Sequence, residues 1–280
     1  MTADTSCHRF HGATLAEREV AGLRLVERRY APGQRTPKHS HDRAYIGLIL
    51  KGFSVQAAGT RQFERGPMTA LLYPPGQVHS ERFGDRGSRI FSVELDGSTF
   101  ARLGTASRAR SGLIDSRGGR FAWLAARLYG EFRQPDDVAE LAIDGLVLEM
   151  LATAARQAQP TSGPRPPAWL VRAREILDAR FNERVGLGEL AAAAGVHPVH
   201  LSAVFRRKYG VTVGEHVRRL RVEFACRELA ASDAPLTAVA LAAGFANQAH
   251  FARTFKRFTG LTPRQYRSVS RPPTGRAYPP

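Results

Sequence analysis

Apolar and polar residues fall into short runs through residues 12–95, a pattern typical of β-strands. The runs are rich in β-branched and aromatic residues, and Gly or Pro stands in most of the gaps between them. They read LRLVERRY, AYIGLILKG, FSVQAAG, MTALLYP and RIFSVEL. Short strands separated by turn residues predict an antiparallel barrel or sandwich.

The pattern changes to helical spacing in residues 98–157. Apolar residues recur every three or four positions in FAWLAARLYGEF and in VAELAIDGLVLEMLATAAR, which predicts two helices. The second helix carries one broad apolar stripe, made of Val138, Leu141, Gly145, Leu148, Ala152 and Ala155. This stripe either covers the barrel or forms part of a dimer seam.

A helical pattern occurs twice after a segment rich in Pro, Gly, Ser and Thr. Residues 188–210 and 237–260 share His, Phe, Arg and Gly at matching places. Each copy predicts a short helix, a tight turn at Gly195 or Gly244, and a second helix, which Pro198 opens in the first copy. Two such copies in register predict two helix-turn-helix units.

The second helix of each unit separates an apolar face from a polar one. The apolar residues expected to point into the domain are Leu201, Val204, Phe205, Phe251, Phe255 and Phe258. On the opposite face, Gln248 can bond bidentately to an adenine edge and Arg253 to a guanine, whereas Ser202 is the main polar group of the first copy. The basic residues placed for phosphates are Arg206, Arg207, Lys256 and Arg257. We therefore expect the two copies to read DNA unequally.

The stretch from Leu190 to Arg267 resembles the DNA-binding domain of the AraC/XylS family of bacterial transcription regulators, most specifically in GFANQAHFARTFKRFTGLTPRQYR. The resemblance implies two helix-turn-helix units joined by a long helix, here VGEHVRRLRVEFACRELAAS, with two recognition helices in successive major grooves. Carried over by position, it implies base contacts at Val199, Ser202, Ala203, Gln248, Ala249, His250 and Arg253. The first recognition helix departs from the family because it lacks a long polar side chain. For His200 and His250, a packing role is the alternative to reading bases.

Three histidines in the N-terminal part suggest a ligand site. In PKHSHDRAYIGLILKG, alternation places His39 and His41 on one face of a strand, and PPGQVHSERF supplies His79 after a Pro-x-Gly turn. These segments resemble the two cupin motifs, which implies that the three histidines converge inside a barrel. Tyr45 stands where metal-binding cupins usually carry Glu.

The histidines have two open interpretations. They could hold a divalent metal such as Zn, Fe, Ni or Cu and leave one position for a small molecule. Alternatively, they hydrogen-bond an effector or each other. The predicted effector pocket comprises His39, His41, Tyr45, Phe53, Tyr73 and His79, with Phe63 and Phe83 as further aromatic residues that could equally belong to the barrel core.

Composition and charge argue against a membrane or disulfide-rich protein and favour one that binds a polyanion. The 280 residues are 43% hydrophobic, with no run close to the ~18 apolar residues of a membrane span and no signal-peptide core, so we expect a cytoplasmic protein. Two cysteines do not suggest a disulfide framework. Residues 165–280 hold 19 Lys and Arg against 8 Asp and Glu, or +11, while residues 1–164 hold 22 against 17, or +5. The C-terminal part is therefore the candidate for binding a polyanion, unless the arginines reflect codon bias.

Together these patterns predict an α+β protein with a cupin-like antiparallel β-barrel, helices, and an all-helical double helix-turn-helix domain. The expected parts are a sensor barrel (1–97), a helical subdomain with a candidate role in dimerisation (98–158), a linker (159–167), a DNA-binding domain (168–270) and a disordered tail (271–280). The predicted function is sequence-specific transcriptional regulation in response to a small-molecule effector, without enzyme activity. Candidate further partners are RNA polymerase and a second copy of the chain. Two alternatives stay open, a metal-dependent cupin enzyme fused to a DNA-binding domain and an architectural protein that binds any DNA.

Overall fold

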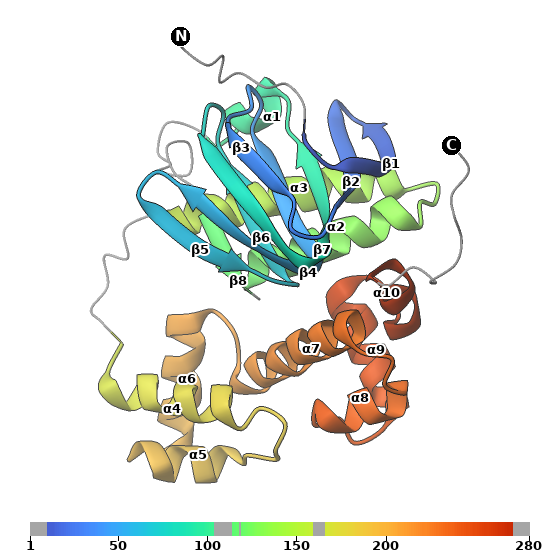
Figure 1. The fold of residues 1–280 in the computed structure, drawn as a ribbon. Helices are drawn as coiled ribbons and strands as arrows, with labels where there is room; N and C mark the ends of the chain where they lie inside the picture. Colours follow the sequence, from blue (N-terminus) through green and yellow to red (C-terminus); the bar gives the residue numbers. More distant parts are fainter. Residues whose placement is uncertain (1–9, 104–113, 118, 159–165, 271–280) are drawn as a thin grey trace. The chain divides into compact units, whose positions relative to one another are not determined.

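The computed structural model describes residues 10–103, 114–117, 119–158 and 166–270. The chain divides into two compact units, residues 1–160 with 259–280 and residues 161–258. Figure 1 labels the helices and strands of both units. The predicted tail and most of the predicted linker lie outside the described residues, as does Cys7. The division into five parts stays a prediction.

The first unit is built on one antiparallel sheet, which has eight strands in the described part of the chain. Its strands are β1 (Ala13–Val20), β2 (Leu23–Tyr30), β3 (Arg35–His39), β4 (Tyr45–Ala58), β5 (Arg61–Arg65), β6 (Thr69–Tyr73), β7 (His79–Glu94) and β8 (Ile114–Arg117). The order along the sheet is β1-β2-β7-β4-β6-β8, while β3 pairs with β7 and β5 pairs with β4. The long strands β4 and β7 therefore lie at the centre of the unit.

A bend in β4 and β7 gives the sheet its curvature. Their mutual register shifts between Ile49 and Lys51 and between Gly52 and Ser54, which marks two irregularities of the β-bulge kind. Gly52 has a φ of +78°, and a Cβ on it would lie 2.0 Å from the carbonyl oxygen of Gly87, so only glycine fits there. Before the bend β4 pairs with β6, and after it with β5. The sequence pattern predicts two strands here, and the structure has one bent strand.

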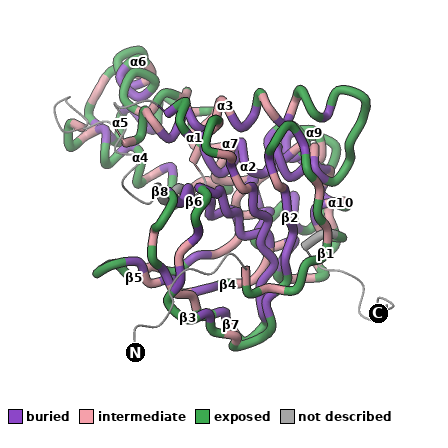
Figure 2. The backbone as a smooth tube through the Cα atoms, turned by 90° about the horizontal axis from the view of Figure 1, so that it is seen from above, coloured by how far each residue is buried: buried purple, intermediate pink, exposed green. Residues whose placement is uncertain are grey.

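Two long helices follow the sheet, after the short α1 (Gly97–Ala101). α2 (Arg120–Arg133) packs on β4 and β6, and α3 (Ala139–Ala158) packs on α2. The buried positions follow the sheet and α2 (Figure 2). α3 buries Ile143, Val147 and Met150, whereas Val138 and Leu141 of the predicted stripe are 60% and 75% exposed. The predicted stripe is therefore not the face that α3 buries within its own unit.

The C-terminal part is helical throughout its described residues. Its helices are α4 (Ala168–Ala179), α5 (Leu187–Ala194), α6 (Pro198–Tyr209), α7 (Val213–Ala231), α8 (Leu236–Ala242), α9 (Gln248–Thr259) and α10 (Pro263–Ser270). The pairs α5–α6 and α8–α9 are the two predicted helix-turn-helix units, and α7 joins them. Gly195 and Gly244 have φ of +70° and +81°, the left-handed conformation expected of the turns.

Each helix-turn-helix unit has its own apolar core. The core of the first helix-turn-helix unit contains Leu190, Leu201 and Phe205, which pack with Leu170 and Leu177 of α4. The buried residues of the second helix-turn-helix unit are Val239, Ala240, Phe245, Phe251 and Phe255. The predicted fold class, an antiparallel β domain followed by helices and a double helix-turn-helix domain, is confirmed. Among the described residues, no helix is long and apolar enough to cross a membrane.

Candidate functional site

The three histidines predicted from the cupin-like motifs converge inside the sheet domain. His39 in β3 lies directly opposite His79 in β7 in the strand register, and His41 follows two residues after β3 ends. One ring nitrogen from each side chain lies within 4.8 Å of the others. All three side chains are buried, with exposed fractions of 5% for His39, 6% for His41 and 4% for His79. The expected convergence is confirmed.

Backbone carbonyls fix the orientation of two of these rings. The Nδ1 of His39 lies 2.8 Å from the carbonyl of Pro37, and the Nδ1 of His79 lies 3.0 Å from the carbonyl of Gln77. Because a carbonyl only accepts, each Nδ1 carries the proton and each Nε2 keeps its lone pair. The Nε2 of His79 then accepts from the Tyr45 hydroxyl at 3.0 Å.

His41 differs from the other two histidines in its hydrogen bonding. Its Nε2 is buried without a hydrogen-bond partner among the described residues. Its backbone carbonyl accepts from the amide of Gly76 at 2.8 Å, which ties the histidine to the turn before β7. A buried imidazole nitrogen with no partner is what a ligand atom or a metal ion would satisfy.

Two of the three histidines, His41 and His79, are neutral around pH 7. Burial and the neighbouring imidazoles of His79 and His39 lower the pKa of His41 to about 3. Burial also lowers the pKa of His79 to about 4, against the opposing effect of its hydrogen bond to the Gln77 carbonyl. Burial raises the pKa of Tyr45, so its hydroxyl stays a proton donor. Protons therefore do not compete for the nitrogen lone pairs of His41 and His79 near neutrality.

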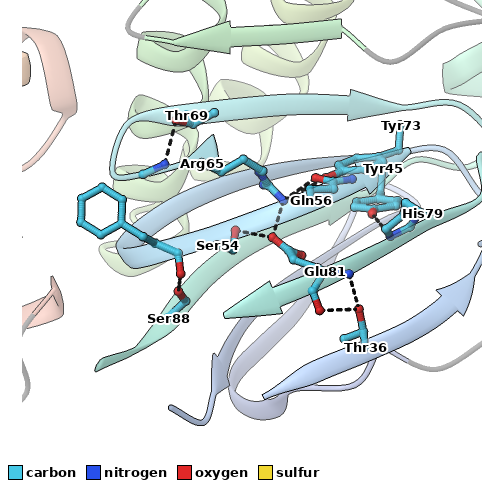
Figure 3. A network of polar contacts seen from close by, with 12 residues as sticks. Thr36, Tyr45, Ser54, Gln56, Arg65, Thr69, Tyr73, His79, Glu81 and Ser88 are labelled. Carbon is cyan, nitrogen blue, oxygen red and sulfur yellow. Dashed lines mark hydrogen bonds and ion pairs between the residues drawn. The ribbon is translucent and has the colours of Figure 1, made fainter. Parts of the chain in front are cut away.

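A second polar group, centred on Arg65, lies next to the histidines (Figure 3). Nη1 of Arg65 donates to Glu81 at 2.9 Å, to the Tyr73 hydroxyl at 2.9 Å and to Gln56 at 3.0 Å. The Ser54 hydroxyl also donates to Glu81. Arg65 is 2% exposed and the Glu81 side chain 9% exposed, so this ion pair is shielded from water. Nε2 of Gln56 is a second buried atom without a hydrogen-bond partner in the described part of the chain.

A small cavity lies between these two groups. Its volume is about 30 Å³, room for roughly one water molecule or one ion. Phe10 helps to fill the space, because its ring stacks on His41 at 4.1 Å between ring centroids and lies under the guanidinium of Arg28 at 4.1 Å. The lining includes Phe10, Arg28, His39, His41, Tyr45, Arg65, Tyr73, His79 and Glu81. An organic effector therefore needs side chains to move before it can enter.

The prediction that Phe53 belongs to the pocket is wrong. Phe53 is 60% exposed and does not line the cavity. The cause is the irregularity at Gly52, because after it Ser54 and Gln56 are the buried residues of β4, and alternation then turns Phe53 outward. Phe63 and Phe83 pack in apolar clusters beside the cavity rather than lining it. The other predicted pocket residues do line it.

Sequence reasoning missed several polar residues of the cavity. Glu81 carried a usable signal, because it stands two residues after His79 on the same strand and so shares its face. Gln56 and Arg65 carried no such signal, since their meeting with Glu81 depends on how β4, β5 and β7 pair. Arg28 and Phe10 come from still more distant segments.

The second candidate site is the exposed face of α6 and α9. Val199 is 70% exposed at the start of α6, and Gln248 and Arg253 are exposed on α9. Exposed as well are Ala203, Arg206, Arg207, Ala249, His250, Lys256 and Arg257, while Ser202 is half-buried. The apolar residues predicted for the inner face are buried. Both helices therefore present the predicted residues outward.

The first turns of these helices are held by side-chain caps. Nδ1 of His197 accepts from the amide of Val199 at 3.3 Å, and the Asn247 side chain accepts from the amide of His250 at 2.8 Å. The His250 ring also meets Phe245 edge to face at 5.4 Å, although the residue is exposed. His250 therefore has a packing contact and still lies on the outer face.

Comparisons with known proteins cover both parts of the chain. Residues 22–151 match the family described as AraC-like ligand binding domain, and residues 190–268 match a helix-turn-helix domain family. An uncharacterized HTH-type transcriptional regulator of Staphylococcus aureus (strain COL) is 39% identical over 93 residues, which are 33% of this chain and 12% of that protein. The bifunctional transcriptional activator/DNA repair enzyme AdaA of Bacillus subtilis (strain 168) is 29% identical over 117 residues, 41% of this chain and 56% of that protein.

Solved structures also resemble the chain. An apo form of ToxT from Vibrio cholerae strain SCE256 aligns with 88% of this chain and 96% of its own, with a TM-score of 0.41 and 11% identity. The C-terminal domain of AraT from Geobacillus stearothermophilus aligns with 38% of this chain and 88% of its own, with a TM-score of 0.37 and 27% identity. The two family matches, in the order expected from the sequence, show that the chain belongs to the AraC family of transcriptional regulators.

Proposed function

We propose that this protein is a sequence-specific DNA-binding transcriptional regulator whose N-terminal sheet domain binds a small-molecule effector. The observation that carries the DNA-binding half is the pair of α6 and α9, which expose basic and polar side chains while burying their apolar faces. Two recognition helices joined by α7 suit two successive half-sites on one duplex. The proposal assigns no enzyme activity to the chain.

The two recognition helices read DNA unequally in this proposal. Gln248 and Arg253 on α9 contact base edges, together with Ala249 and His250. On α6, Val199, Ser202 and Ala203 offer one hydroxyl and small apolar groups, which suit a thymine methyl. The basic residues Arg206, Arg207, Lys256 and Arg257 contact phosphates. The second unit therefore supplies most of the base discrimination.

The effector site lies at the cavity of the sheet domain. His39, His41, His79, Tyr45 and Tyr73 line it and offer both donors and acceptors. The effector shifts the conformation of the protein only if it binds one conformer more tightly than another, and displacement of Phe10 from His41 is one change that entry would require. Phe53 has no part in this site.

A divalent metal is a second candidate occupant, favoured by the His41 nitrogen that lacks a partner. Three buried imidazoles, each with a ring nitrogen within 4.8 Å of the others, fit a tetrahedral three-histidine site with one open position. Tyr45 is a weaker substitute for the usual carboxylate, so modest affinity is expected. Elemental analysis of the purified protein tests this, with the His39→Ala, His41→Ala double variant as control. Metal bound near stoichiometrically and lost in the double variant supports the site, and its absence leaves a metal-free pocket.

A second copy of the chain is a proposed partner through α3. Val138, just before this helix, and Leu141, in its first turn, are exposed. The rest of the stripe, Gly145, Leu148, Ala152 and Ala155, is exposed or half-buried. An apolar face left open beside a buried one suits association with an identical face. Leu141→Asp should shift a dimer to monomer in analytical ultracentrifugation. RNA polymerase stays a candidate partner of a regulator of this kind.

Footprinting on the DNA that flanks the protein's own coding region tests the main proposal. We expect a protected site made of two half-sites, whose occupancy changes when the effector is added. Equal affinity for all sequences would favour an architectural protein. Turnover by the sheet domain of a metabolite would favour the metal-dependent enzyme.

A further inference from the structure

A cationic groove lies between the two helix-turn-helix units and reaches the start of the second recognition helix. Its volume is about 390 Å³, and it is formed by the loop between α4 and α5, the first half of α7 and the start of α9. The charged residues that line it are Arg180, Glu183, Arg184, Arg218 and Arg221, and His250 lines it as well. The four guanidinium groups against one carboxylate give the groove a net positive charge.

Two of these arginines already form ion pairs or hydrogen bonds within the domain. Arg180 forms ion pairs with Glu183 and Glu189, each at 2.7 Å. Arg221 donates to the backbone carbonyls of Phe181 and Glu183, at 2.7 and 2.8 Å, and so ties α7 to the α4–α5 loop. These contacts stabilise the groove wall and leave little capacity for a ligand.

The other two arginines are available for an anion. Within the described residues, neither Arg184 nor Arg218 forms an ion pair with a carboxylate, and Nε of Arg218 is buried without a hydrogen-bond partner. Nη1 of Arg218 lies 3.4 Å from where a Cβ of Gly214 would stand, so the guanidinium covers the first turn of α7. Burial, and to a smaller extent the charge of Arg184, lower the pKa of Arg221.

The place of the groove indicates which anion it meets. His250 lines the groove and also belongs to the outer face of α9, between Ala249 and Phe251. His250 thus connects the groove to the face of α9 that the proposed function places against DNA. Guanidinium groups bind phosphate oxygens bidentately, and phosphate contacts fix the register of a protein on the duplex.

We propose that Arg184 and Arg218 bind backbone phosphates of the DNA segment between the two half-sites. This inference rests on the proposed function, because it assumes that α6 and α9 contact one duplex. The contact would carry no base information. It would set the spacing at which both recognition helices engage, since the groove lies between the two units.

The first experiment measures DNA affinity of the full-length chain against salt concentration. We expect the Arg184→Ala, Arg218→Ala double variant to bind random-sequence and operator duplexes about tenfold more weakly, with a salt slope smaller in magnitude by about 1.8. Arg172→Ala is the matched control, because Arg172 is exposed on α4 and does not line the groove. Arg218→Lys should retain most of the affinity. Circular dichroism checks that each variant is folded.

The second experiment locates the phosphate. In an operator defined by footprinting, single phosphates are replaced with uncharged methylphosphonates. A replacement between the half-sites should weaken binding of the wild type and leave the double variant unchanged. Equal effects of the double variant and of Arg172→Ala, or sensitive phosphates only within the half-sites, would overturn the inference while leaving the proposed function intact.

A free phosphorylated small molecule is the alternative ligand for Arg184 and Arg218, because it offers the same phosphate oxygens as DNA. ATP and inorganic phosphate are titrated into the wild type and the double variant. Tight ATP binding that the double variant loses, with an unchanged DNA salt slope, would overturn the DNA contact. A wild-type chain without salt-sensitive DNA binding would overturn both this inference and the proposed function.

Discussion

The cavity of the sheet domain and the outer faces of α6 and α9 use polar side chains in opposite ways. In the cavity, Arg65 and the histidines are buried, and the Glu81 side chain is only 9% exposed. Arg65 and Glu81 hydrogen-bond to each other, while His39 and His79 hydrogen-bond to backbone carbonyls of the same domain. On the recognition helices, Gln248 and Arg253 are exposed and their polar groups face water. A polar residue of the cavity therefore contributes to folding as well as to binding, whereas one on α6 or α9 contributes to binding alone.

The largest expected effect is on the stability of the sheet domain. Glu81→Gln removes the carboxylate that faces the buried guanidinium of Arg65, and removing one partner of a buried pair should lower the free energy of unfolding by about 3–5 kcal/mol. The control is Glu17→Gln, whose pair with Arg24 is exposed and should be worth less than about 1 kcal/mol. Urea unfolding followed by Trp123 fluorescence, in a Trp169→Phe background, measures both. Equal losses would contradict the distinction between the two pairs.

The histidines should make the stability of the same domain depend on pH. The pKa values of His41 and His79 are about 3 and 4 in the folded protein, below the ordinary 6.5 that the unfolded chain keeps. The unfolded chain therefore binds these protons more tightly. The stabilisation is complete above the unfolded pKa and is lost as the pH falls toward the folded values. The slope is up to about 1.4 kcal/mol per pH unit for each imidazole.

The variant His41→Gln tests this assignment. Its urea unfolding, followed through Trp123 as before, should depend less steeply on pH between the unfolded and folded pKa values. His250→Gln is the control, because that histidine is exposed on α9. An unchanged slope in His41→Gln would show that other groups titrate with folding.

Effects on the recognition helices should appear in binding and not in stability. Arg253→Ala should cost roughly 1–3 kcal/mol on the operator and relax the preference at one base pair. Arg207→Ala should weaken binding to all sequences alike and reduce the salt slope by about 1. Competition binding against random DNA separates the two outcomes. If Arg253→Ala lost the same affinity on operator and random DNA, the reading face would be assigned incorrectly.

The cavity and the recognition helices also differ in how well the sequence predicts them. The helix-turn-helix units follow from local signals, since Gly195, Gly244 and the spacing of Phe251 and Phe255 determine turns and faces within a few residues of chain. His39 and His79 were found because the cupin-like motifs implied their convergence. The Arg65 network was missed because its members meet only through strand pairing across the bent sheet. Phe53 was misplaced because the bulge at Gly52 sets which residues of β4 face inward.

The smallest expected effect sharpens the contrast between the two recognition helices themselves. Ser202 is half-buried on α6 and offers one hydroxyl, so Ser202→Ala should cost only about 0.5–1 kcal/mol on the operator, the value of a single neutral hydrogen bond. Gln248 is exposed on α9 and can form two bonds to one adenine, so Gln248→Ala should cost roughly 1–3 kcal/mol. Binding measured on the operator at one salt concentration compares them directly. A larger loss for Ser202→Ala would mean that the first unit, despite its short side chains, supplies the dominant base contact.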